Sequence, residues 1–276
     1  MDAITVGLIQ MNSRADKARN LAKIDAFVAE AARLGAQLVA LPEYVTYLGP
    51  KDRYPEVAEP IPGPTTERFA ALARAHRIHL LGGSILELSE EPGRYYNTST
   101  LFDPDGNLIA RYRKIHLFDV AIGRDVVFRE SELIKPGSEV VTARVFGRTV
   151  GLSICYDVRF PELYRALAEA GAEILFVPAA FTMFTGKDHW EVLLRARAIE
   201  NQCFVVAPAQ LGRHEPNGWS YGRSLVVDPW GLVIARASDV EGPLVARLDL
   251  GLVRRVREEL PALAHRRLGL AAGVVS

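Results

Sequence analysis

The sequence has little cysteine, no excess charge and no long apolar run. Two cysteines among 276 residues cannot form the disulfide framework of a small secreted domain, so we expect reduced thiols. The 33 basic residues balance the 33 acidic ones, which gives no reason to expect binding to nucleic acid or to an anionic membrane. No stretch approaches the roughly 20 apolar residues of a membrane span. A small molecule is therefore the expected partner.

The composition and the first residues fit an ordinary globular protein. Apolar residues make up 49% of the chain and charged residues 24%, enough for a core that needs neither disulfides nor metal. The opening segment MDAITVGLIQMN has an acidic residue where a signal peptide needs basic ones. Gln10 and Asn12 also interrupt its apolar run. We expect a cytoplasmic protein.

Short apolar runs alternate with segments of helical periodicity, and this pattern occurs twice. Matching segments follow one another in the same order: 6–10 with 150–154, 29–43 with 165–179, 77–83 with 202–208, and 101–111 with 226–236. The last pair shares an Asp-Pro-x-Gly turn, which predicts a β-hairpin in each copy. Two similar halves predict a single domain, residues 1–276, of α/β class: a four-layer αββα sandwich of two pseudo-symmetric halves.

Three predicted strand ends carry reactive side chains. Glu43 follows the run AQLVALP, Lys114 follows the first hairpin, and Cys155 follows RTVGLSI. Functional groups of parallel sheets collect just beyond the carboxyl ends of strands. Each residue alone has a plain structural interpretation: a solvated carboxylate, a surface ammonium and a buried thiol. Their joint placement indicates instead a thiol with a general base and an oxyanion donor, which predicts acyl transfer through a thioester.

Longer motifs surround these residues. The strings LPEY (41–44), YRKIHLFD (112–119) and GLSICYDVRFPELYRALAEAGAEIL (151–175) resemble the glutamate, lysine and cysteine motifs of the nitrilase superfamily of carbon–nitrogen hydrolases. The resemblance covers nearly the whole chain and itself implies an αββα sandwich. It implies Glu43 as the base, Lys114 as an oxyanion donor and Cys155 as the nucleophile. A second glutamate of the family matches Glu130, in VVFRESELIKPG (126–137).

The resemblance also explains why Cys155 ends its strand. At that position the thiol enters a pocket, and the backbone N–H of Tyr156 can serve as a second oxyanion donor. We expect Asp157, Arg159 and Glu162 to hold the turn and not to touch substrate. No metal or organic cofactor is implied.

Within the superfamily the closest resemblance is to the Nit subgroup. That subgroup includes the amidases of deaminated glutathione and of 2-oxoglutaramate, and QLGRH (210–214) and HRR (265–267) look more like the former. We therefore expect hydrolysis of a primary ω-amide of a small carboxylic or α-keto acid, with release of ammonia.

Two departures from the subgroup's pattern bear on substrate binding. Arg223 stands where histidine is usual, and Lys187 stands beside a second unexpected charge, Asp188. Solvated loop charges explain both equally well. An acidic group on the substrate would need a cation in the pocket. The residues that we consider as substrate contacts or as that cation are Arg223, Lys187, Tyr221, Phe181, Arg195 and Arg197.

Other functions remain open on this fold. They are an N-carbamoyl amino acid or aliphatic amide hydrolase, an acyltransferase that passes the thioester to an amine, and a non-catalytic binding protein. The resemblance further implies a homodimer or higher homo-oligomer. We expect the helices around 160–171 and 185–200 to form the interface, with Leu163 and Leu167 buried there, and the segment 268–276 to reach across it.

Overall fold

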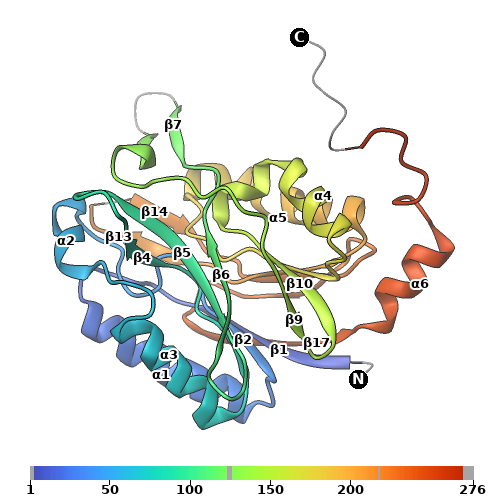
Figure 1. Ribbon diagram of the computed structural model, residues 1–276, viewed down its shortest axis with the longest axis horizontal. Coiled ribbons are helices and arrows are strands. Elements are labelled where there is room, and N and C mark those ends of the chain that lie inside the picture. The colour runs from blue at the N-terminus through green and yellow to red at the C-terminus, as the bar shows by residue number, and fades with distance from the viewer. Residues whose placement is uncertain (1–2, 123–125, 217, 270–276) are drawn as a thin grey trace.

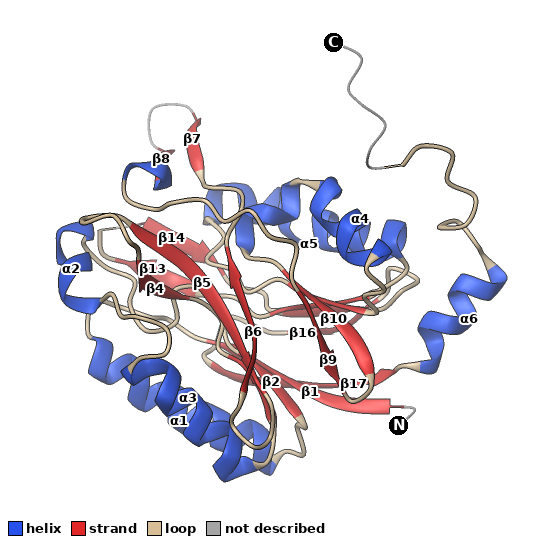
Figure 2. Cartoon of the chain, in the orientation of Figure 1, coloured by secondary structure: helices blue, strands red, loops and turns tan. Residues whose placement is uncertain are grey.

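Two β-sheets pack face to face with helices on both outer surfaces. The computed structural model describes residues 3–122, 126–216 and 218–269. In Figure 1 helices α1 and α3 cover one outer face, α4 and α5 cover the other, and both sheets run between them. Figure 2 shows the same layers by secondary structure. The predicted αββα sandwich is confirmed.

The first sheet has the order β17-β1-β2-β3-β5-β4, with β6 paired to β5. Strands β1, β2 and β3 are parallel, and β5 and β6 form the hairpin that follows them. The elements of this half are β1 (Ala3–Gln10), α1 (Lys17–Arg33), β2 (Leu38–Ala40), α2 (Tyr54–Val57), α3 (Pro64–His76), β3 (His79–Leu81), β4 (Ile85–Leu88), β5 (Tyr95–Phe102) and β6 (Leu108–Arg113).

The second sheet repeats the arrangement in the order β16-β15-β12-β11-β10-β9. Strands β10, β11 and β12 are parallel, and β15 and β16 form the hairpin. The elements are β9 (Thr142–Val145), β10 (Arg148–Leu152), α4 (Pro161–Glu169), β11 (Ile174–Phe176), α5 (Met183–Asn201), β12 (Phe204–Ala207), β15 (Leu225–Val227) and β16 (Val233–Arg236).

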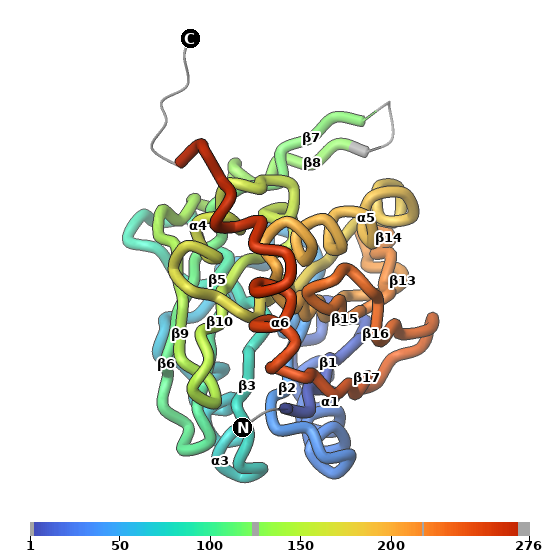
Figure 3. Tube along the Cα trace, turned by 90° about the vertical axis from the view of Figure 1, so that its right-hand side faces the viewer, coloured from blue at the N-terminus to red at the C-terminus, as the bar shows by residue number. Residues whose placement is uncertain are grey.

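Short elements lie between and after the two halves. Strand β17 pairs antiparallel with β1 in the first sheet, and α6 follows it on the outside of the molecule (Figure 3). No helix in the described residues is both long and apolar enough to cross a membrane. The remaining elements are β7 (Asp119–Ile122), β8 (Val126–Arg129), η2 (Glu130–Glu132), η3 (Cys155–Arg159), β13 (Leu211–His214), β14 (Gly218–Tyr221), β17 (Gly242–Asp249) and α6 (Gly251–Glu259).

The two hairpin turns are built in the same way, as the repeated Asp-Pro-x-Gly predicts. The Asp103 carboxylate accepts hydrogen bonds from the N–H groups of Asp105 and Asn107. Asp228 accepts the equivalent bonds from Trp230 and Leu232. Each hairpin also shifts register at its matching position, 101/102 in one and 226/227 in the other. The internal repeat therefore extends to the details of the backbone.

Glycine lets a helix approach each sheet closely at equivalent positions. A methyl group on Gly7 would lie 3.0 Å from Cβ of Ala31 in α1, and one on Gly151 would lie 3.0 Å from Leu167 in α4. These contacts are tighter than packed side chains normally allow, so the helices sit directly on the β1 and β10 backbones.

The expectation that Leu163 and Leu167 form a dimer interface was wrong. Both side chains are buried within the chain, 4% and 0% exposed, in the core that includes residues of both sheets. The apolar face of α4 therefore packs on its own sheet. Most of the C-terminal segment expected to cross an interface, residues 270–276, lies outside the described part of the chain.

Candidate active site

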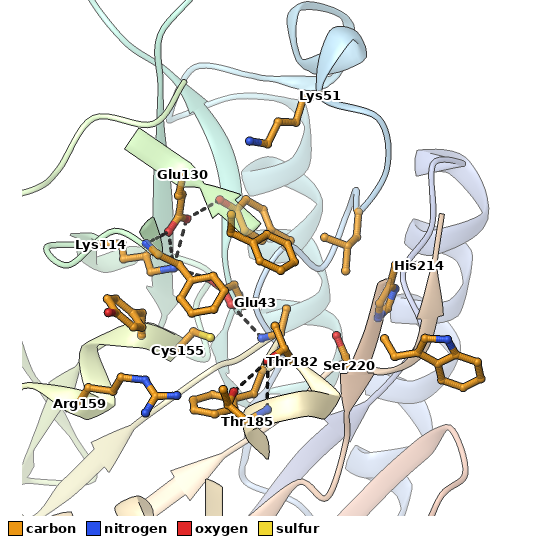
Figure 4. A pocket seen from close by; sticks show the side chains of 18 of the residues that line it. Glu43, Lys51, Lys114, Glu130, Cys155, Arg159, Thr182, Thr185, His214 and Ser220 are labelled. Carbon is orange, nitrogen blue, oxygen red and sulfur yellow. Dashed lines mark hydrogen bonds and ion pairs between the residues drawn. The ribbon is translucent and has the colours of Figure 1, made fainter. Parts of the chain in front are cut away.

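Glu43, Lys114 and Cys155 meet where the two halves of the sandwich join (Figure 4). Glu43 lies three residues beyond β2, Lys114 directly follows β6, and Cys155 lies three residues beyond β10. The first sheet supplies two of the groups and the second sheet supplies the thiol. The sequence predicted this convergence from strand ends alone.

The Glu43 carboxylate is held from both sides. One oxygen, Oε1, accepts hydrogen bonds from Lys114 Nζ and Asn97 Nδ2, each at 2.9 Å. The other, Oε2, accepts from the backbone N–H of Ala180 at 2.8 Å. Only 2% of the Glu43 side chain is exposed, so these partners replace water and fix the carboxylate beside Cys155.

Glu130 forms the other side of this network. It follows β8 at the start of η2, and its carboxylate lies 2.9 Å from Lys114 Nζ. The Tyr44 hydroxyl donates to Glu130 at 2.8 Å and the Phe118 N–H donates at 2.7 Å. Lys114 thus bridges two carboxylates, and its ammonium position is fixed by both halves of the network.

The charge states follow from this pairing. Burial alone would lower the pKa of Lys114, but the carboxylates of Glu130 and Glu43 outweigh it and hold that pKa well above its ordinary value. Burial would likewise raise the pKa of Glu130, yet Lys114 and the Phe118 and Tyr44 donors keep it below its ordinary value. The network is therefore a buried ammonium between carboxylates, with Glu130 ionised at neutral pH.

The Cys155 thiol is protonated in this environment. Burial first, and the Glu43 carboxylate second, raise the pKa of Cys155 well above its ordinary value, and Lys114 offsets only part of this. A thiol that is not ionised at rest needs a base to become a nucleophile. Glu43, whose carboxylate lines the same cavity as the thiol and helps to raise the pKa of Cys155, is the carboxylate placed to act as that base.

The Cys155 backbone occupies a conformation that residues other than glycine rarely adopt. Its φ is +46°, where β10 turns into the short helix η3, and its N–H donates to Pro178 O at 2.9 Å. The Tyr156 N–H lies in the first turn of η3, where backbone donors have no partner within the helix. This geometry places the thiol at a sharp turn beside a backbone donor.

Asp157 holds this turn, as the sequence predicts. Its carboxylate accepts from the Ile154 N–H at 2.8 Å, the His116 N–H at 3.0 Å and the Tyr112 hydroxyl at 2.7 Å. Because Tyr112 and His116 flank the Lys114 segment, Asp157 ties the cysteine turn to the lysine strand end.

A cavity of about 110 Å³ surrounds the thiol. Its wall is largely aromatic, and the cations Lys51 and Arg159 also reach it. The Arg159 guanidinium lies 5.0 Å from the Phe181 ring centroid and has no carboxylate partner within 4.0 Å among the described residues. The aromatic lining residues are Tyr44, Tyr54, Phe118, Phe128, Tyr156, Phe181 and Trp219.

The structure sorts the residues considered for substrate binding. Phe181 lines the cavity, but Arg223, Lys187 and Tyr221 are not among its described lining residues. Arg223 pairs with Asp239 at 2.7 Å, and Lys187 pairs with its neighbour Asp188.

The other two arginines have structural partners. Arg195 Nε donates to Gly231 O at 2.8 Å, and the buried Arg197 donates to Val158 O at the same distance. Both hold backbone in place. Among the described lining residues the one arginine is Arg159, which we expected only to support the cysteine turn.

Sequence reasoning missed several residues of this site. Tyr44 follows Glu43 with φ +51°, which turns its hydroxyl to Glu130. Asn97 is buried in β5, where an amide in an otherwise apolar and hydroxylic strand was the available signal. Lys51 begins the short helix Lys51–Arg53 and His214 ends β13, and neither segment carries a local signal. No cluster of metal-ligating side chains occurs in the described residues.

Comparison with known proteins identifies the family of the chain. The family model described as carbon–nitrogen hydrolase matches residues 5–258. The chain belongs to the carbon–nitrogen hydrolase family. It is a hydrolase acting on carbon–nitrogen bonds, and its nitrilase-like fold agrees with the resemblance in the sequence.

Two curated relatives of this hydrolase carry different names. The deaminated glutathione amidase of Homo sapiens is 45% identical over 269 residues, covering 95% of this chain and 82% of that protein. The omega-amidase NIT2 of Homo sapiens is 38% identical over 272 residues, covering 99% and 98%.

Solved structures give the same family. The C. elegans NitFhit protein superposes with a TM-score of 0.88 at 38% identity, covering 98% of this chain and 67% of that one. An amidase from Nesterenkonia sp. AN1 superposes with a TM-score of 0.76 at 29% identity, covering 94% and 95%, and carries a covalent adduct of fluoroacetamide at its active site cysteine.

Proposed function

We propose that this hydrolase is a cysteine amidase that cleaves the ω-amide of a small α-keto acid through a Cys155 thioester. The observation that carries the proposal is the buried Glu43–Lys114–Glu130 network beside a protonated thiol. This set provides a base, a fixed cation and a nucleophile without a cofactor.

In the first half-reaction the Cys155 sulfur attacks the amide carbonyl carbon. Glu43 takes the thiol proton, and the carbonyl oxygen becomes an oxyanion that Lys114 Nζ and the Tyr156 N–H stabilise. Glu43 then gives the proton to the departing nitrogen. The carbon–nitrogen bond breaks, and a thioester and a free amine remain.

In the second half-reaction a water molecule replaces the amine beside Glu43. The carboxylate removes a proton as the water oxygen attacks the thioester carbon. Collapse of the second oxyanion breaks the carbon–sulfur bond, and Cys155 leaves with the proton held by Glu43. The products are the free acid and the resting enzyme.

Glu130 and Tyr44 have positioning roles in this scheme. Glu130 prevents Lys114 from pairing with Glu43 alone, so the ammonium stays beside the thiol while Glu43 cycles through its protonated form. Tyr44 fixes Glu130 through its hydroxyl. Loss of either contact would move the oxyanion donor without removing a reacting group.

We assign recognition of the acid group to Arg159. Its guanidinium lines the cavity beside Phe181 and Tyr156, and a planar guanidinium binds a carboxylate through two parallel hydrogen bonds. An α-keto acid bound there would extend its ω-carbonyl toward Cys155.

Among such substrates we propose deaminated glutathione ahead of 2-oxoglutaramate, which the higher identity to the amidase of that name supports. The two differ in what leaves: 2-oxoglutaramate releases ammonia, whereas the ω-carbonyl of deaminated glutathione is bonded to a dipeptide amine. The expected ammonia release therefore applies to 2-oxoglutaramate only.

The test is to measure kcat/KM for both compounds, a neutral aliphatic amide and an N-carbamoyl amino acid. We expect the keto acid amides to lead, and Arg159→Lys to lower their kcat/KM by about tenfold or more while sparing the neutral amide. A tenfold preference for either of the last two compounds would exclude the keto acid assignment. Turnover that requires an added amine would indicate an acyltransferase, and no turnover would indicate a binding protein.

We also propose that the chain forms a homodimer through α5 and the β15–β16 turn. Val192, Ile199, Trp230 and Leu232 are exposed there by 49–66%, and the turn packs against Ile199. Light scattering should give twice the chain mass, and Leu232→Asp should halve it. Leu108→Asp, on the hairpin of the other half, is the control and should leave the mass unchanged.

Finally, we propose a single catalytic domain and a cytoplasmic location. The family match over residues 5–258 supports one domain, and the two free cysteines, 155 and 203, fit a reducing compartment. Expression of the tagged chain followed by fractionation would test the location.

A further inference from the structure

A second, wider depression borders the cavity around Cys155. This outer depression has a volume of about 610 Å³, against about 110 Å³ for the inner cavity. The two share Lys51, Phe128, Thr182 and Trp219 in their walls, so the outer depression lies directly beside the inner cavity.

The inner cavity has little room beyond the keto acid part of a substrate. A cavity of about 150 Å³ holds one benzene molecule, which has six heavy atoms. The cavity around Cys155 is smaller, so a keto acid bound between Arg159 and Cys155 would fill it. A larger group on the amine side of the scissile amide would therefore lie in the neighbouring outer depression.

Large apolar side chains line the outer depression and are exposed there. Met183 and Phe184 begin α5, Val127 lies on β8 and Trp219 on β14, with 40–56% of each residue exposed. Four such residues from three separate segments rarely gather on a surface that contacts only water. The depression therefore has the composition of a site for an apolar group.

The position of the outer depression relative to Arg159 indicates how the substrate is oriented. Arg159 lines the inner cavity but not the outer depression, whereas Lys51 lines both. Figure 4 shows Arg159 and Lys51 on opposite sides of Cys155. If the keto acid is anchored at Arg159, the amine side of the scissile bond points toward Lys51 and the outer depression.

Two ammonium groups complete the outer depression. Lys187 is exposed, and its pairing with the equally exposed Asp188 is of the kind that water screens. Lys51 Nζ donates to Arg129 O at 3.0 Å and has no carboxylate partner within 4.0 Å in the described chain. Both ammonium groups can accept an anionic group on the ligand.

We propose that the outer depression is a leaving-group subsite, which binds an amine that carries a large apolar side chain and a free carboxylate. Met183, Phe184 and Trp219 contact the side chain, and Lys187 and Lys51 contact the carboxylate. The inference rests on the proposed function, and it adds that the enzyme selects its amide by the amine as well as by the acid.

Three amides of 2-oxoglutarate test this subsite: the primary amide, the glycine amide and the phenylalanine amide, all assayed by release of 2-oxoglutarate. We expect kcat/KM for the phenylalanine amide to exceed that for the glycine amide by about tenfold, since an aromatic side chain is buried. Equal values for the two would overturn the proposal.

Variants of the outer depression test whether its residues cause the preference for the phenylalanine amide. Phe184→Ala should reduce the phenylalanine-to-glycine ratio to about threefold or less, while Leu88→Ala, an equally exposed residue elsewhere, leaves it unchanged. We expect a higher kcat/KM for the phenylalanine amide than for the same compound with the phenylalanine carboxylate replaced by a carboxamide. Lys187→Gln should remove this difference. If Phe184→Ala leaves the ratio unchanged, or if it changes the oligomer mass instead, the depression binds no leaving group.

Failure of the subsite can be told apart from failure of the proposed function. If no 2-oxoglutarate amide is hydrolysed, the proposed function is wrong. Binding of free amino acids then tests whether the subsite exists. Phenylalanine should change the fluorescence of Trp219 in the Cys155→Ala protein with a lower Kd than glycine, and Phe184→Ala should abolish the difference. Equal Kd values for phenylalanine and glycine in the Cys155→Ala protein that retains Phe184 would overturn the subsite, whatever the enzyme hydrolyses.

Discussion

The two halves of the sandwich share a scaffold and differ at the ends of their strands. Cys155 lies three residues beyond β10, and its counterpart after β1 is the buried Met11. Glu43 follows β2, whereas its counterpart after β11 is Ala179. Pro42 and Pro178 precede the latter pair in both halves. The backbone of the repeat is thus kept, and each reactive side chain is present in only one copy.

The hairpins show the same division. Lys114 follows the first hairpin, and the position that matches it after the second hairpin is Asp239. Lys114 is 2% exposed between two carboxylates, whereas the Asp239 side chain is 68% exposed and pairs with Arg223. The fold thus places a charged residue after each hairpin, but of these two only Lys114 is buried.

Removal of the thiol should have the largest effect on activity, because the first half has no equivalent group. We expect Cys155→Ala to lower kcat by at least about a thousandfold. Cys203→Ala is the matched control, since that thiol is fully buried away from the cavity, and it should keep most activity. A tenth of the original rate in Cys155→Ala would refute the assignment of the nucleophile.

Glu43→Gln should have the next largest effect, a loss of about a hundredfold to ten thousandfold in kcat. The amide keeps the size of the side chain but cannot accept the thiol proton, which the raised pKa of Cys155 makes necessary. Glu56→Gln, an exposed carboxylate on α2, is the control. Rapid thioester formation by Glu43→Gln, seen by mass spectrometry, would contradict the role as base.

Tyr44→Phe should have a smaller effect, a loss of about tenfold in kcat/KM. The hydroxyl helps to keep the pKa of Glu130 low, so its removal raises that pKa and Glu130 becomes protonated at a higher pH. The acidic limb of the pH profile should therefore move to higher pH. Tyr47→Phe, whose hydroxyl donates to Pro50 O, should not move it, and an unchanged limb in Tyr44→Phe would remove the positioning role.

Substitutions at Gly7 and Gly151 compare the stability of the two halves directly, and they should not affect the catalytic step. Gly7→Ala and Gly151→Ala should each lower the free energy of unfolding by about 1–3 kcal/mol, because the added methyl group meets a helix at 3.0 Å. The two losses should be similar, since the Cβ atoms of Ala31 and Leu167, which cannot rotate away, lie 3.0 Å and 3.1 Å from the added methyl groups. Urea denaturation measures both, and the absence of a loss at either glycine would contradict this packing argument.

The sequence predicted those features that repeat or that follow directly from strand ends. The sandwich, its two halves and the meeting of Glu43, Lys114 and Cys155 could all be inferred from local pattern. Arg159 could not, because its four-residue distance from Cys155 does not reveal which side of the short helix η3 it leaves. Lys51 reaches the cavity from the short helix Lys51–Arg53 and Trp219 from β14, and no local pattern encodes that approach.

The expectation for Leu163 and Leu167 failed for a similar reason. The apolar positions of residues 160–171 correctly indicate an amphipathic helix with one face covered. Periodicity identifies that face but does not say what covers it, a partner or the chain's own sheet. In this protein the chain's own core covers Leu163 and Leu167.

Strand β17 has a consequence for the order in which the protein assembles. It pairs along all of β1, from Ala3 with Asp249 to Gln10 with Gly242, so the first strand made waits for one of the last. Until then β1 has one open edge, a site for pairing with other chains. Closing so long a loop is slow, and the delay exposes nascent chains to aggregation. A newly made chain that ends before Gly242 would carry every proposed catalytic residue and still lack a closed first sheet.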